Sequence, residues 1–152
     1  MTILCVHRDA DNDTDENVYI NSINPALQEL STKKDFDYCK TITLIIPVYM
    51  IEAWLLADKE LFKKEIGTVK SDVELGINRK PEAISDPKQT IKEAIRISRQ
   101  EVALKRRKDL SINDIYMPLG QKIGMQKLNE LSSYIKFKKS VKAAFTKLNY
   151  IH

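Results

Sequence analysis

The stretch that decides the fold is LCVHRDADND, residues 4–13, near the start of the printed sequence. An apolar run leads here directly into a cluster of carboxylates. In α/β proteins, ligands bind in the crevice beyond the carboxyl ends of parallel strands. A strand that ends at Asp9 and Asp11 therefore brings two acidic side chains to the usual place for a site. The two point to the same side if the backbone stays extended.

Two interpretations of this stretch remain open when it is considered alone. Neighbouring carboxylates repel each other unless a cation or a proton lies between them, and Mg²⁺ is commonly held by one or two carboxylates together with water and phosphate. The first interpretation is a site for Mg²⁺ or Mn²⁺ on Asp9 and Asp11, with Asp13 as a further ligand. The second is a solvated loop whose last acids cap the following helix.

A second strand is expected at residues 41–48, where the sequence TITLIIPV is β-branched and nearly all apolar. This pattern is typical of a strand buried on both faces. An amphipathic helix is expected within residues 15–33, and Pro25 should kink or divide it. Strand, helix and strand in this order predict a parallel pair with a right-handed crossover. The predicted fold class is therefore α/β, with a small parallel sheet and a helical C-terminal half.

The run YMIEAWLLAD, residues 49–58, predicts a short buried helix directly after the second strand. Glu52 is its unusual residue, because Glu is rarely buried without a partner and an unpaired carboxylate is costly away from water. A metal ion shared with Asp9 and Asp11 would explain this burial, since the ends of the two strands lie side by side. The alternative is a Glu at a helix N-terminus, stabilised by the helix dipole.

Sequence signals also place the ends of the later helices. Asp86 and Pro87 predict a helix start, as N-cap and first helical residue, with the helix reaching about residue 104. Ser111 and Asp114 resemble an N-terminal capping pattern. Pro118 is expected to kink or restart the helix that contains it.

Charge is unevenly distributed, although the formal net charge is only +4. Through Glu60 the chain carries 5 Lys and Arg against 11 Asp and Glu, a net of −6. From Leu61 onward it carries 20 against 10, a net of +10. An acidic site region joined to a basic region suggests a partner that carries both metal ions and phosphates, such as nucleic acid. The alternative is an ordinary, well-solvated helical surface.

Two groups of basic residues are the candidate contacts to a nucleic-acid backbone. One is the run at residues 105–108, although a basic helix C-terminus is also favoured by the dipole alone. The other lies on the last helix, expected at residues 132–148, whose lysines lie opposite its inward-facing side. The residues expected to face inward are Ile135, Val141, Ala144, Phe145 and Leu148. The candidates are Lys105, Arg106, Arg107, Lys108, Lys138, Lys139 and Lys142.

Length and composition indicate one domain with a substantial core, since the chain has 152 residues, of which 43% are apolar. Residues 1–66 form its acidic-site region and residues 67–152 its mainly helical basic region. No apolar run approaches the ~20 residues of a membrane span, and no secretory signal is visible, so a cytoplasmic protein without a membrane partner is expected. Cys5 and Cys39 are expected to be reduced and buried. With only two histidines, a zinc site is not expected.

Several stretches, taken together, resemble a bacterial domain-of-unknown-function family (family 4276) related to Toprim domains. Toprim domains occur in primases, topoisomerases and the nucleases of phage-defence systems. The stretches are RDAD at residues 8–11, IP at 46–47, IEAWLLAD at 51–58, DPK at 86–88 and LG at 119–120, with Ile123 and Phe137 beyond. The resemblance covers most of the chain, and EAWLLAD is its most specific part.

The resemblance implies a nuclease that depends on Mg²⁺ or Mn²⁺ and acts in phage defence. Asp9 and Asp11 match the Toprim Asp-x-Asp, and Glu52 stands where the nuclease branch has a further acid. Lys88 stands at a family Lys position and joins the candidate nucleic-acid contacts. The alternative is a non-catalytic nucleic-acid-binding or regulatory subunit of a larger complex.

One departure from the Toprim pattern concerns the first strand. The pattern has a Glu after an earlier strand, many residues before Asp-x-Asp, whereas Asp9 follows only a few residues here. That part is then missing from this sequence, supplied by another chain, or lost together with activity. A sheet of two strands also leaves an edge that invites pairing. Residues 2–8 are therefore expected to pair with a second copy or with a partner chain.

Overall fold

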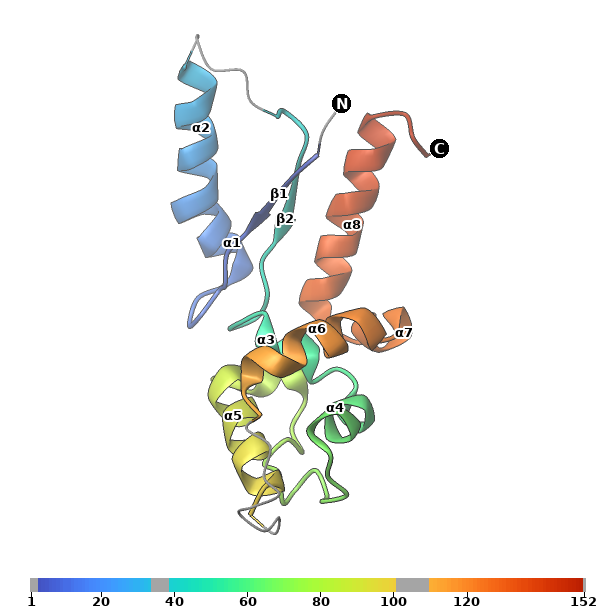
Figure 1. Ribbon diagram of the computed structural model, residues 1–152. Coiled ribbons are helices and arrows are strands. Elements are labelled where there is room, and N and C mark those ends of the chain that lie inside the picture. Colours follow the sequence, from blue (N-terminus) through green and yellow to red (C-terminus); the bar gives the residue numbers. More distant parts are fainter. Residues whose placement is uncertain (1–2, 34–38, 101–109, 152) are drawn as a thin grey trace.

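The computed structural model describes residues 3–33, 39–100 and 110–151 (Figure 1). Two parallel strands, β1 (Leu4–His7) and β2 (Ile42–Ile45), form the sheet in these ranges. The helices, in chain order, are α1 (Asp15–Val18), the π-helical turn η1 (Tyr19–Ile23), α2 (Asn24–Thr32), α3 (Glu52–Leu55), α4 (Lys59–Ile66), the 3₁₀ turn η2 (Pro81–Ala83), α5 (Pro87–Ser98), α6 (Ile112–Lys122), α7 (Met125–Leu128) and α8 (Ser132–Lys147). The predicted α/β class, parallel pair and helical C-terminal half are confirmed.

Pro25 divides the first helical segment, as its sequence predicts. Proline has no N–H to donate, and its ring collides with the carbonyl one turn back in a regular α-helix. The chain responds with the wider turn η1, in which the Asn24 N–H bonds to the Tyr19 carbonyl, five residues back. The helix then resumes as α2, with Pro25 in its first turn.

The two strands differ in how well they are covered. In β2, Thr43 is buried and its neighbours are half-buried, so cover on the two faces is less complete than predicted. In β1, only Val6 is half-buried and the other three residues are exposed. The prediction of a buried Cys5 is therefore wrong, because nothing in the described residues packs over the outer part of β1. Cys39 is half-buried, and within the described residues the two thiols are not joined in a disulfide.

The main hydrophobic core lies among the helices, below the sheet in Figure 1. It joins α3, α4, α5 and α6 with the loop after α4. Its fully buried members are Leu56, Phe62, Ile66, Leu75, Ile77, Ile91, Ala94, Ile115 and Leu119. Burial of each large apolar side chain contributes roughly 1.5–3 kcal/mol, so this cluster is the main source of stability. A second, smaller cluster of Ala10, Val18 and Ile23 lies beside the sheet.

Helix α8 returns to the sheet and lies along β2, on the opposite side from α2 (Figure 1). The Ser140 hydroxyl accepts hydrogen bonds from the Thr43 hydroxyl at 3.0 Å and from the Leu44 N–H at 3.2 Å. Ser140 therefore attaches α8 to β2, although α3 to α7 lie between these two elements in sequence.

The buried face of α8 agrees with the prediction only in part. Of the residues expected to face inward, Ala144 is buried and Val141 and Leu148 are half-buried. Ile135 and Phe145 are instead 37% and 38% exposed, and Tyr134, which was not predicted, is buried. The reason is that Ser140, a polar residue, sits against β2 and sets the rotation of the helix. Sequence hydrophobicity does not reveal such a contact.

Other helix ends agree with the sequence signals, with two exceptions. Asp86 caps α5 through a 2.8 Å hydrogen bond from the Gln89 N–H, and Ser111 with Asp114 forms the capping box of α6. However, α5 ends at Ser98, before the predicted position, and residues 101–104 lie outside the described residues. Helix α6 also continues through Pro118 without restarting. In the described part of the chain, no helix is long and apolar enough to cross a membrane.

Candidate metal site at the strand ends

Backbone hydrogen bonds continue beyond the two strands and hold their carboxyl ends together. The Ala10 N–H donates to the Pro47 carbonyl at 3.2 Å, and the Asp11 N–H donates to the Tyr49 carbonyl at 2.8 Å. Asp11 and Tyr49 both have left-handed backbones, with φ of 51° and 57°. The segments that follow β1 and β2 thus turn at neighbouring positions. The extended backbone that would align the Asp9 and Asp11 side chains ends at Ala10.

The Asp9 carboxylate joins the end of β1 to the start of α3. Its Oδ1 accepts a 3.0 Å hydrogen bond from the Ile51 N–H and lies 3.1 Å from His7 Nε2. Ile51 directly precedes Glu52, the first residue of α3. The structure therefore brings the Asp9 side chain next to the segment that carries Glu52, as the parallel strand ends predict.

Glu52 is buried, with only 7% of its surface exposed, and it has protein partners. Its Oε1 accepts a 2.6 Å hydrogen bond from the Tyr116 hydroxyl of α6. Lys88 Nζ of α5 lies 4.0 Å from the same oxygen. The burial of this carboxylate is thus explained by a hydroxyl and an ammonium group, together with its place in the first turn of α3.

Tyr116 was not identified from the sequence, because 64 positions separate it from Glu52 and no local pattern connects them. Burial, and then the hydrogen bond to Glu52, raise the pKa of Tyr116 to about 12. The phenol therefore stays protonated at neutral pH and remains a hydrogen-bond donor to the carboxylate.

Asp11 and Asp13 do not join Asp9 and Glu52 in one cluster. Asp13 accepts hydrogen bonds from the Thr14 N–H and the Asn17 side chain, and these bonds lower the pKa of its carboxyl, the Asn17 bond most. Asp13 thus supports the start of α1, as the capping interpretation predicts. Across residues 3–33, 39–100 and 110–151, no group of three or more His, Cys, Asp and Glu side chains could hold a metal ion.

The carboxylate oxygens of Asp9 and Glu52 are nevertheless of the kind that a hard divalent cation binds. Each carboxylate has one oxygen engaged by protein donors, whereas the described residues donate no hydrogen bond to its second oxygen. Mg²⁺ is often held by only one or two carboxylates and completes its shell with water. Asp9 and Glu52 are thus the candidate carboxylates for Mg²⁺ or Mn²⁺, whereas the exposed Asp11 lies on the adjoining loop and does not join them in a group.

The predicted nucleic-acid contacts fall into three groups. Lys88 is 49% exposed beside Glu52. Lys138, Lys139 and Lys142 are exposed on α8 as predicted, and Lys138 donates a 3.1 Å hydrogen bond to the Asn129 side chain. The run of Lys105, Arg106, Arg107 and Lys108 lies outside the described residues.

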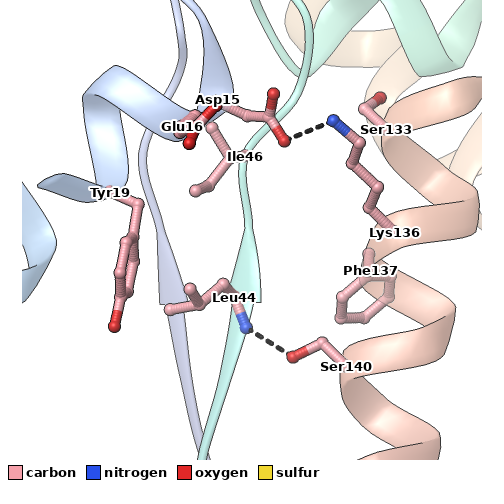
Figure 2. Close-up of a pocket in the computed structure, with 9 residues that line it drawn as sticks. All are labelled: Asp15, Glu16, Tyr19, Leu44, Ile46, Ser133, Lys136, Phe137 and Ser140. Atoms are coloured by element: carbon pink, nitrogen blue, oxygen red, sulfur yellow. Dashed lines mark hydrogen bonds and ion pairs between the residues drawn. The ribbon is translucent and has the colours of Figure 1, made fainter.

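A pocket of about 290 Å³ lies between α1, β2 and α8 (Figure 2). Leu44, Ile46 and Phe137 form its apolar wall, and Lys136 pairs with Asp15 across its rim. The Ser140 hydroxyl is used by the backbone of β2. Of the polar groups drawn around this pocket, those of Lys136, Ser133 and Ser140 thus serve to attach α8.

Comparisons with protein-family models, with curated proteins and with solved structures find no match for this chain. The case for any function therefore depends on the strand-end geometry and on the charges around it.

Proposed function

We propose that the chain is a Toprim-like, metal-dependent nuclease or nuclease domain that acts on nucleic acid. One observation carries the proposal: the 3.0 Å hydrogen bond between Asp9 and the Ile51 N–H holds the acidic end of β1 against the residue before Glu52. Two carboxylates from neighbouring strand ends are typical ligands of Mg²⁺ or Mn²⁺. When bound there, such an ion activates water and stabilises charge on phosphate.

Basic residues around the site support a polyanionic substrate. The half-exposed Lys88 lies beside Glu52. The Trp54 indole N–H bonds to the Ser133 hydroxyl at 2.8 Å, which fixes the start of α8 against α3. Lys138 to Lys142 then lie about 8–14 Å along the axis from Ser133, at a rise of about 1.5 Å per residue. A phosphate backbone several nucleotides long could reach both groups. A role of such a nuclease in phage defence is part of this proposal.

A second candidate is a non-catalytic nucleic-acid-binding or regulatory subunit of a larger complex. One observation favours it, namely that no three acidic side chains converge within the described residues. In that case the lysines keep their role, and Asp9 and Glu52 serve only to join β1, α3 and α6.

A cleavage assay separates the two candidates. Supercoiled plasmid and short single strands are incubated with Mn²⁺ and the wild-type chain, or with Asp9→Asn, Asp11→Asn or Glu52→Gln. Glu93→Gln is the control, because Glu93 is paired with Arg96 on the exposed side of α5. The proposal predicts cleavage by the wild type and the control, and its loss in Asp9→Asn and Glu52→Gln. A folded wild type that binds Mn²⁺ without cleaving either substrate contradicts the nuclease proposal.

A further inference from the structure

The pocket between α1, β2 and α8 has an apolar bottom and two aromatic sides. Leu44 and Ile46 lie between Tyr19 of η1 and Phe137 of α8, and all four line it (Figure 2). Its volume is about 290 Å³, whereas an apolar cavity of about 150 Å³ already holds benzene. It shares no lining residue with the pocket at the acidic strand-end loop, residues 8–13. This separate pocket is thus large enough for an aromatic ring with a polar group attached.

The Phe137 side of the pocket is fixed before any ligand binds. The centre of the Phe137 ring lies 5.9 Å from that of Trp54 and 6.1 Å from that of Tyr134, which is buried. Tyr19, on the opposite side, is 39% exposed, so its ring still presents apolar surface to water. A ligand ring would cover this surface, and both the burial of apolar area and contact between aromatic rings favour binding.

Charges of opposite sign lie on the two sides of the pocket. Asp15 and Glu16 of α1 line one side, and Lys136 of α8 lines the other. Lys136 pairs with Asp15 across the rim, whereas Glu16 has no hydrogen-bond or ion-pair partner among the described residues. One unpaired carboxylate therefore remains on the α1 side, where it favours a ligand with an ammonium group.

The backbone N–H of Ile46 offers a donor on the α8 side. The Ile45 carbonyl accepts a hydrogen bond from the residue after β1, and backbone groups alternate in direction along a strand. The N–H groups of Leu44 and Ile46 therefore point away from β1, and that of Leu44 bonds to Ser140 of α8. No described residue accepts the Ile46 N–H. Together with the Lys136 ammonium group, this donor favours a ligand carboxylate.

We propose that this pocket binds a free α-amino acid with an aromatic side chain. The side chain packs between Tyr19 and Phe137. The ammonium group pairs with Glu16, and the carboxylate accepts hydrogen bonds from Lys136 and the Ile46 N–H. An ammonium and a carboxylate group next to an aromatic ring match a pocket with opposite charges on its two sides and an apolar bottom. The inference does not rest on the proposed nuclease function, and either can fail without the other.

The first test is a calorimetric titration of the full chain with L-phenylalanine and with three analogues that each lack one of its groups. Glycine lacks the ring, phenethylamine lacks the carboxylate, and 3-phenylpropanoate lacks the ammonium group. We expect L-phenylalanine to bind, and each analogue to bind at least about fivefold more weakly. The inference is overturned if L-phenylalanine does not bind, or if any analogue binds as tightly.

Paired substitutions then test where the ligand lies. Tyr19→Ala removes one aromatic side, and its control is Ile20→Ala, because Ile20 is 51% exposed and does not line the pocket. Glu16→Gln removes the unpaired charge, and its control is Glu29→Gln, an exposed acid of α2.

We expect Tyr19→Ala and Glu16→Gln each to weaken L-phenylalanine binding by about fivefold or more, while the controls bind like the wild type. Urea unfolding, followed by the fluorescence of Trp54, the only tryptophan, shows whether each variant is folded. Wild-type affinity in either folded variant contradicts this placement and overturns the inference. Should Tyr19→Ala unfold, Glu16→Gln decides alone.

Discussion

At the scale of single residues, the carboxylates differ in how many of their oxygens accept hydrogen bonds from the protein. Within the described part of the chain, Asp9 and Glu52 each accept such bonds at one oxygen only, whereas Glu82 uses both. Its two oxygens accept four hydrogen bonds, from the N–H and the hydroxyl of both Ser132 and Ser133, at 2.6–2.9 Å. It thus caps α8 from a position 50 residues away in sequence, and Trp54 bonds to the same Ser133.

Replacement of Glu82 by Ala should destabilise the chain by about 1–3 kcal/mol, because helix N–H groups and hydroxyls lose their acceptor. Urea unfolding measures the change. The control is Glu130→Ala, an exposed residue that pairs only loosely with Lys127 at 3.7 Å, for which a change within about 0.5 kcal/mol is expected. Equal losses in the two variants would contradict this role of Glu82.

The same contact predicts a pH dependence of stability. Burial opposes ionisation of Glu82, but the hydrogen bonds from Ser133 and Ser132 outweigh it and lower the pKa of the carboxyl. A group with a lowered folded-state pKa stabilises the fold above its unfolded pKa, and this contribution is lost as the pH falls through the folded value. The wild type should therefore lose more stability than Glu82→Gln on acidification below about pH 5. Parallel unfolding curves for the two proteins across that range would exclude the effect.

At the scale of elements, the outer edge of β1 is the most conspicuous feature. Leu4 and Arg8 direct their N–H groups to β2, so those of Cys5 and His7 point away from it. The described residues provide no partner for this edge, and an isolated two-stranded sheet is marginal in water. We therefore expect pairing at β1, in purified protein with a second copy of the chain.

This pairing predicts association that a single proline should abolish. Cys5→Pro removes an outward N–H and leaves the bonds between β1 and β2 in place. Cys5→Val is the control, because it keeps the N–H and favours a strand. Sedimentation equilibrium should show a dimer for the wild type and Cys5→Val, and a monomer for Cys5→Pro. A wild type that stays monomeric at high concentration would contradict pairing between copies.

The sequence predicts elements well where the cause is local. The caps at Asp86 and Ser111 and the divided helix at Pro25 each depend on a few neighbouring residues, so their patterns are visible in the chain. The rotation of α8 depends on Ser140 meeting β2, and the partner of Glu52 is Tyr116; both are contacts between distant segments. The approach of the Asp9 side chain to the residue before Glu52 could thus be predicted from the strand ends, whereas the contacts that Glu52 makes could not.

At the scale of the whole molecule, the acidic strand ends and the basic α8 face suggest binding to a phosphate backbone. Affinity for DNA should then fall steeply with salt, because counterions are released from each contacted phosphate. In Lys139→Ala/Lys142→Ala, the slope of log affinity against log salt should decrease by up to about 2. Lys64→Ala, an exposed residue of α4, should leave the slope unchanged. An equal slope in all three proteins would remove α8 from the interface.

The central claim is that Asp9 and Glu52 together hold a hard divalent cation, and Trp54 offers a direct test of it. Trp54 is the only tryptophan and lies two residues after Glu52. Tb³⁺ prefers oxygen ligands, as Mg²⁺ does, and its luminescence is sensitised by a nearby indole or phenol; excitation at the red edge of the tryptophan absorption band selects the contribution of Trp54. We predict Trp54-sensitised Tb³⁺ luminescence that excess Mn²⁺ displaces and that disappears in Asp9→Asn/Glu52→Gln. Luminescence that survives in this double variant, or is absent from the wild type, would contradict the claim.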